Sequence, residues 1–156
     1  MKKLFALLSL SLVTLSSASA FAQAPGTTGV GVVVGSPNGL TARHWINEEN
    51  SVEGSLGWAL SDSRFQVNVN YLWNRANLIH IGEENFDLFF GAGLGLRTKS
   101  GKQNGEVVFG PRLPVGVAYT FADPNLELFA QAALNVGIIP SSDVYVDGNL
   151  GLRFYF

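Results

Sequence analysis

Two histidines, His44 and His80, are the side chains best suited to acid–base or metal chemistry in this chain of 156 residues, which contains no cysteine. A histidine that activates a nucleophile within one strand needs a hydroxyl two residues away. His44 is followed by Trp-Ile and His80 by Ile-Gly, so neither has that neighbour. The two also lie far apart in sequence without clustered carboxylates, which is a poor arrangement for a metal ion. We therefore expect His44 to be an interfacial or packing residue and His80 a solvated loop residue, with no catalytic or metal site.

Two glycine-rich stretches resemble dinucleotide fingerprints at first sight: GVGVVVG (Gly29–Gly35) and GAGLGLR (Gly91–Arg97). The fingerprint needs G-x-G-x-x-G at the start of a helix. The first stretch has the wrong spacing, and no helical pattern follows either one. Both are better explained as strand glycines, and no cofactor is expected.

Eight charged residues have the types and positions needed for enclosed ion pairs. Four are arginines and four are carboxylates, with no lysine among them. Enclosed charges are costly unless they are paired, and the rigid fork of arginine suits such pairing. We expect a charge network inside the protein, with Arg153 near Glu127 at one end and Arg97 or Arg112 near Asp147 at the other. Its expected members are Arg43, Glu53, Asp87, Arg97, Arg112, Glu127, Asp147 and Arg153.

The elements that must position these charges are short runs in which apolar and polar residues alternate. Seven connectors rich in Asn, Asp, Ser, Gly or Pro separate them, which is typical of an all-β sandwich or barrel. The expected strands are 28–35, 39–47, 51–60, 64–74, 86–97, 107–121, 126–138 and 144–156.

Each run presents one apolar face and one polar face, as the strand period requires. A soluble sandwich or lipocalin-like barrel would bury the apolar face. An outer-membrane barrel would bury the polar face and turn the apolar one to lipid. Alternation alone does not choose between the two.

Strand length and the nature of the polar face favour the membrane barrel. Several runs reach about ten residues, the length that crosses a bilayer at a tilt. The polar face carries Gly, Ser, Asn, Gln and balanced charges, whereas a soluble surface would be dense in lysine and glutamate. Beyond the N-terminal segment, the lysines fall in one connector, as Lys99 and Lys102.

Aromatic residues on the apolar face are sorted by height, as expected of the girdles of a membrane barrel. One rim should collect Tyr71, Trp73, Phe86, Tyr119, Phe121, Phe154 and Phe156; the other should collect Trp58, Phe65 and Phe109. The polar interior should hold Trp45, Leu72, Phe89, Phe129, Tyr145 and Tyr155, with inward glycines making room for them.

The N-terminal segment, residues 1–22, has the pattern of a secretory signal peptide: Lys2 and Lys3, then an apolar stretch, then small residues. We expect cleavage after Ala22, with Ala20 as the other position, leaving one domain over 23–156. Removal of the two lysines leaves 8 basic and 12 acidic residues, which is unfavourable for binding nucleic acid.

The last strand resembles the C-terminal signal of bacterial outer-membrane barrels, because Leu150, Leu152 and Phe154 share one face with the final Phe156. In that class the signal is read by the barrel-assembly machinery. The chain also resembles the small OmpA-type and OmpX-type barrels and, more closely, a family of small single-domain outer-membrane barrels. That resemblance rests on GVGVVVGSPNGLTARHWI, GPRLPVGVAYTF and LGLRFYF.

The resemblance implies an all-β, eight-stranded antiparallel up-and-down transmembrane β-barrel in the outer membrane, in contact with lipid and lipopolysaccharide. The expected role is non-enzymatic, in envelope integrity or surface interaction, with a side-chain-filled lumen. A narrow pore for ions or small solutes and a lipid A-modifying enzyme are the alternatives. The connector 98–106 is the candidate for contact with an unknown host or surface ligand.

Overall fold

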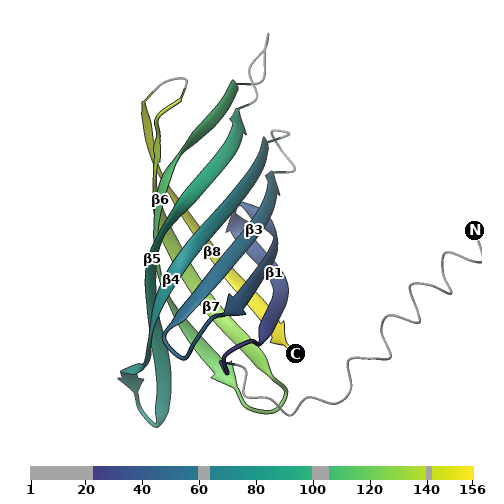
Figure 1. Cartoon of the computed structure of the whole chain (residues 1–156), viewed down its shortest axis with the longest axis vertical. Coiled ribbons are helices and arrows are strands. Elements are labelled where there is room, and N and C mark those ends of the chain that lie inside the picture. Colours follow the sequence, from purple (N-terminus) through teal and green to yellow (C-terminus); the bar gives the residue numbers. More distant parts are fainter. Residues whose placement is uncertain (1–22, 60–63, 100–105, 140–141) are drawn as a thin grey trace, which may run out of the picture.

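The computed structural model describes residues 23–59, 64–99, 106–139 and 142–156. Within them the chain forms eight antiparallel strands that close into one barrel, with the strands tilted to its axis (Figure 1). The bounds are β1 Thr28–Ser36, β2 Asn38–Trp45, β3 Asn50–Ala59, β4 Arg64–Ile81, β5 Glu84–Lys99, β6 Glu106–Phe121, β7 Leu126–Gly137 and β8 Asp143–Tyr155. The predicted signal peptide lies outside the described residues.

The barrel is an up-and-down ring in which each strand pairs with its neighbour in sequence, and β1 closes against β8. The closing seam pairs Val32 with Leu152 and Val34 with Leu150. Among the described residues, no helix is long and apolar enough to cross a membrane. The predicted fold class is confirmed.

One connector was predicted wrongly. Residues 75–85 were expected to form a loop, but β4 continues to Ile81 and β5 begins at Glu84. His80 therefore lies in a strand, where it pairs with Asn85. The register shifts between Arg75 and Ile79, and Asn77 has a positive φ of 54°. This irregularity breaks the period-two pattern, which is why the sequence read as a loop.

The prolines of β6 interrupt pairing without changing the register. Between Phe90↔Val115 and Gly93↔Arg112 the β5–β6 ladder has a gap, which lies beside Pro114. Proline has no amide hydrogen to donate, so one side of the strand loses a rung. Pairing of the same stretch with β7 continues.

The distribution of side chains decides which face is inside. On the outer wall Val32 and Leu40 are about half exposed, at 52% and 51%, whereas the inward Asn68 and Glu53 are each 1% exposed. The same alternation runs along β7, where outward Leu128 is exposed and inward Glu127 is buried. The barrel therefore has an apolar exterior and a polar, side-chain-filled interior, the reverse of a soluble barrel.

Candidate functional site

Two arginines and two glutamates form a closed ring of ion pairs inside the barrel, which we call the lower charge layer: Arg43, Glu53, Glu127 and Arg153. The Arg43 Nη2 and Nη1 atoms lie 3.2 Å from Glu53 Oε2 and 3.3 Å from Glu127 Oε2. Arg153 Nη1 lies 2.6 Å from Glu127 Oε1, and its Nη2 contacts Glu53 Oε2. No side chain of the ring is more than 2% exposed. Each guanidinium thus bridges both carboxylates.

Strand register places the ring in two halves. Arg43 on β2 is the direct partner of Glu53 on β3, and Glu127 on β7 is the partner of Arg153 on β8. Facing positions of antiparallel strands bring side chains together on one face. The two halves lie close together because the barrel is closed and only β1 stands between β2 and β8. Their side chains therefore meet inside the lumen.

Neutral donors complete the ring. Glu53 Oε1 accepts hydrogen bonds from Asn70 Nδ2 at 3.1 Å and Gln131 Nε2 at 3.2 Å. The Tyr155 hydroxyl donates to Glu127 Oε2 at 3.1 Å. Every carboxylate oxygen of the ring therefore has a donor, as enclosed charge requires.

Aromatic rings pack against the arginines. The guanidinium of Arg153 lies 3.7 Å from the ring centroid of Phe129, and that of Arg43 lies 4.5 Å from the centroid of Phe89. Stacking over a ring face stabilises a guanidinium in a site without water. Each arginine of the lower charge layer therefore has an aromatic ring beside its guanidinium group.

Inward glycines provide the space for those aromatic rings. A Cβ atom on Gly116 would lie 2.3 Å from Phe89 Cζ, and one on Gly151 would lie 2.2 Å from Phe129 Cζ. Both distances are too short for any side chain. The predicted role of these glycines is confirmed, and Trp45, Leu72 and Tyr155 are also buried as expected.

A second set of buried polar side chains, the upper charge layer, lies toward the other end and contains Arg112 and Asp147. Arg112 Nη1 donates to Asp147 Oδ2 at 2.6 Å and to Asn135 Oδ1 at 2.9 Å. The same Asp147 oxygen accepts from Gln66 Nε2 at 2.8 Å and Asn135 Nδ2 at 3.1 Å. From the sequence, Arg97 or Arg112 was expected near Asp147, and in the structure Arg112 forms the ion pair.

The remaining two predicted charges lie apart from both layers, near the ends of the barrel. Arg97 lies 4.0 Å from Asp143 and stacks at 3.8 Å over the half-buried Tyr145. Asp87 accepts a hydrogen bond from the backbone N–H of Asn77 at 2.8 Å and another from Gln23 Nε2. The eight charges therefore form two buried layers and two end contacts.

Sequence reasoning missed some partners for identifiable reasons. Gln66, Asn135 and Gln131 fall on the predicted inner face, but a neutral amide carries no signal of pairing. Asp143 was assigned to a connector, although β8 begins there. Gln23 precedes the first predicted strand, so nothing linked it to Asp87.

The predicted assembly signal lies on the outer wall. Its four side chains are all exposed, as one apolar stripe along the end of β8: Leu150, Leu152, Phe154 and Phe156. Aromatic residues gather beside it at the same end of the barrel. Tyr119, for example, packs on Phe86 and Phe121 with centroid distances of 5.3 and 4.7 Å.

Neither histidine is part of a charged cluster in the described residues. His44 is exposed on the outer wall and its Nδ1 lies 2.9 Å from Thr28 Oγ1. His80 is exposed on β4. No group of three metal-ligating side chains occurs in the part of the chain that the structure describes.

The barrel has a counterpart among solved structures. The N-terminal β-barrel domain of Pseudomonas aeruginosa OprF superposes with a TM-score of 0.67 at 13% identity, covering 86% of this chain and 100% of that one. This chain has the fold of that domain. Ail, the attachment invasion locus protein of Yersinia pestis, matches at 18% identity over 85% of this chain and 99% of its own, with a TM-score of 0.42. No protein-family model and no curated protein matches the sequence.

Proposed function

We propose that this protein is a non-enzymatic integral barrel of the outer membrane whose lumen is sealed by side chains, with a role in envelope integrity or surface interaction. The observation that carries the proposal is the reversed burial: apolar side chains cover the outside and paired charges fill the inside. In water such an exterior would aggregate, whereas in a bilayer it is the stable arrangement. A closed barrel also leaves no unpaired strand edge in lipid.

The proposed orientation puts the ends of β1 and β8 that meet at Thr28 in the periplasm. The aromatic cluster around Tyr119 would then lie at the inner interface, and the β3–β4 and β5–β6 connections would lie at the cell surface. The barrel-assembly machinery would read the apolar stripe of β8. Lipid and lipopolysaccharide would surround the wall, and the connector 98–106, of which 100–105 lie outside the described residues, would be the candidate for surface contacts.

A sealed lumen follows from how the interior is filled. An eight-stranded barrel is just wide enough for its own side chains. Here the lower charge layer spans the lumen from β2 and β3 to β7 and β8, and Trp45 and Tyr155 pack below it. The N–H of Gly26 also donates to the Trp45 carbonyl at 2.8 Å, which fixes the preceding chain across that end. An ion crossing this layer would have to separate pairs that are each fully enclosed.

Two measurements test the proposal. The refolded protein should show heat-modifiable migration on a denaturing gel and should fractionate with membranes. In planar bilayers it should give no single-channel conductance, whereas Arg153→Ala, which opens the lower charge layer, should give detectable currents. A freely water-soluble monomer without detergent would contradict the membrane assignment, and steady conductance of the unmodified protein would favour the pore.

A further inference from the structure

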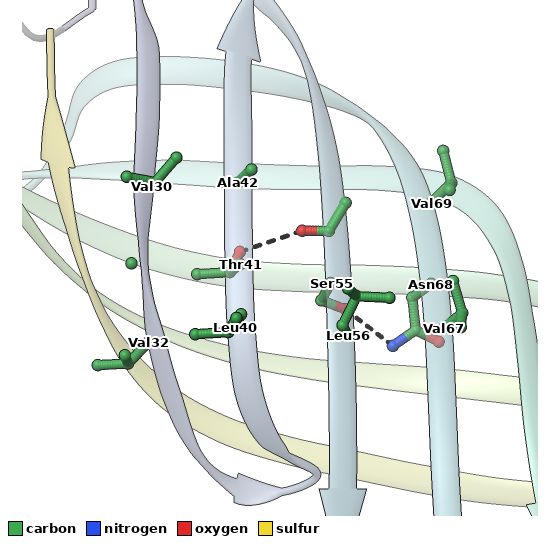
Figure 2. A pocket seen from close by; sticks show the side chains of 12 residues that line it. Val30, Val32, Leu40, Thr41, Ala42, Ser55, Leu56, Val67, Asn68 and Val69 are labelled. Atoms are coloured by element: carbon green, nitrogen blue, oxygen red, sulfur yellow. Dashed lines mark hydrogen bonds between the residues drawn. The ribbon is translucent and has the colours of Figure 1, made fainter. Parts of the chain in front are cut away.

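The apolar outer wall has a hollow across β1–β4, with a volume of about 730 Å³ (Figure 2). Its size lies within the range of roughly 300–1,000 Å³ that small-molecule sites occupy. The outward side chains around it are Val30, Val32, Leu40, Ala42, Leu56, Val67 and Val69.

Small residues form the floor of this hollow. Strand register sets Ala42 on β2 directly beside Gly54 on β3, with Val30 and Val69 on either side in the same row. A Cβ atom added to Gly54 would meet nothing within 4 Å. The floor is therefore open, and the taller neighbours form its walls.

A polar pair lies at one edge of the hollow. The next row toward Thr28 contains His44 and Val52, one step along β2 and β3 from Ala42 and Gly54. His44 is exposed. It is the ionisable side chain among the outward-facing residues of 28–34, 40–44 and 52–58. Thr28 Oγ1 lies 2.9 Å from His44 Nδ1; in the tautomer whose Nδ1 accepts the hydrogen bond of the Thr28 hydroxyl, the ring proton is on Nε2 and is available to an acceptor. Apolar hollow and hydrogen-bond donor thus lie side by side.

We propose that this hollow binds a diacyl phospholipid of the periplasmic leaflet, with one acyl chain over Ala42 and Gly54 and the phosphate accepting a hydrogen bond from His44. The inference rests on the proposed function, because it requires the wall to face lipid. An acyl chain is flexible enough to fill the hollow and gain the dispersion contacts that a gap would lose. His44 pairs with Thr28, the first residue of β1, at the end of the barrel that the proposed orientation puts in the periplasm, where headgroups begin.

A second copy of the barrel fits the same surface less well. Its wall would have to fill the hollow with an apolar ridge while covering His44. The ring N–H would then be buried against apolar side chains without an acceptor, which is costly. A phosphate satisfies that donor.

The test is lipid retention after extraction from vesicles of phosphatidylethanolamine and phosphatidylglycerol, counted by native mass spectrometry of the full-length protein. The unmodified barrel should retain one phospholipid. Gly54→Leu, whose Cβ atom would meet nothing within 4 Å, places an apolar side chain in the hollow and should abolish retention. His44→Phe should lower it by about five-fold, the equivalent of one hydrogen bond.

Gly148 provides the matched control. Like Gly54, it is a strand glycine whose added Cβ would meet nothing within 4 Å, and it too pairs with an alanine, Ala132. Gly148→Leu should retain the lipid like the unmodified protein. Heat-modifiable migration of each variant verifies insertion.

Equal retention by the unmodified, Gly54→Leu and Gly148→Leu barrels, all inserted, would overturn the lipid site and leave the proposed function intact. A dimer that Gly54→Leu dissociates would assign the hollow to a second copy instead. Failure of the unmodified chain to insert would overturn both proposals at once.

Discussion

The two charge layers satisfy their buried ions in different ways. In the lower layer two arginines and two glutamates share one ring, so every ion depends on two partners of opposite charge. In the upper layer a single pair, Arg112 and Asp147, is supported by the neutral amides of Gln66 and Asn135. Loss of one member leaves a buried net charge in either layer, but in the upper layer the Asp147 carboxylate keeps two neutral amide donors.

The largest expected effect is that of Glu53→Gln. It leaves both arginines of the ring with one carboxylate between them, so the free energy of unfolding should fall by about 3–5 kcal/mol. Urea unfolding of the barrel in lipid vesicles measures the loss. Glu83→Gln, at the exposed β4–β5 turn, is the control and should change nothing. A loss below that of the upper-layer variants would remove the distinction between the layers.

Arg112→Met should cost less, about 3 kcal/mol and so the low end of the range for breaking a buried pair, because the amide groups of Gln66 and Asn135 still donate to Asp147. The same unfolding experiment applies. If this variant were as unstable as Glu53→Gln, the amides would contribute nothing to satisfying the carboxylate.

Replacing both upper-layer charges sharpens the comparison. Arg112→Met combined with Asp147→Leu removes the ion pair as a unit and leaves neither of its charges unpaired, so it should lie within about 1 kcal/mol of the unmodified barrel. A double-mutant cycle then gives the coupling of the pair. Additive losses from the two substitutions would show that the contact at 2.6 Å carries no coupling.

The smallest effect is expected at the end of the barrel. Arg97→Gln loses a contact of 4.0 Å to Asp143, whose side chain is 35% exposed. Partly exposed pairs contribute roughly 0–1 kcal/mol, so the change should stay below about 1 kcal/mol and should shrink further in salt. A larger loss would indicate that the stacking of Arg97 on Tyr145 dominates.

Much of this arrangement could be predicted from the sequence, because the period of two fixes the face of each side chain. The period placed Arg43, Glu53, Glu127 and Arg153 on the polar face, and strand length and the composition of that face assigned it to the inside. The structure buries them there. Residues 75–85 could not be predicted in the same way, since a register shift near Asn77 hides the pattern.

Contacts across the lumen were beyond sequence reasoning for a different reason. Arg153 meets Glu53 only because the closed sheet brings β8 close to β3, and that depends on the stagger between strands around the ring. Partners on neighbouring strands, such as Glu127 and Arg153, follow from local pairing. The hollow across β1–β4 could not be predicted either. Ala42 and Gly54 form its floor only when four strands pair in the observed register.

The division of the lower layer into two neighbouring-strand pairs bears on biogenesis. The β2–β3 hairpin carries Arg43 with Glu53, and the β7–β8 hairpin carries Glu127 with Arg153, so each has zero net charge from these residues before the first and last strands meet. If the barrel inserts as proposed, neither hairpin would carry an unpaired ion of this layer into hydrocarbon. In the closed barrel both of these pairs persist, and Arg43–Glu127 and Arg153–Glu53 join the two hairpins.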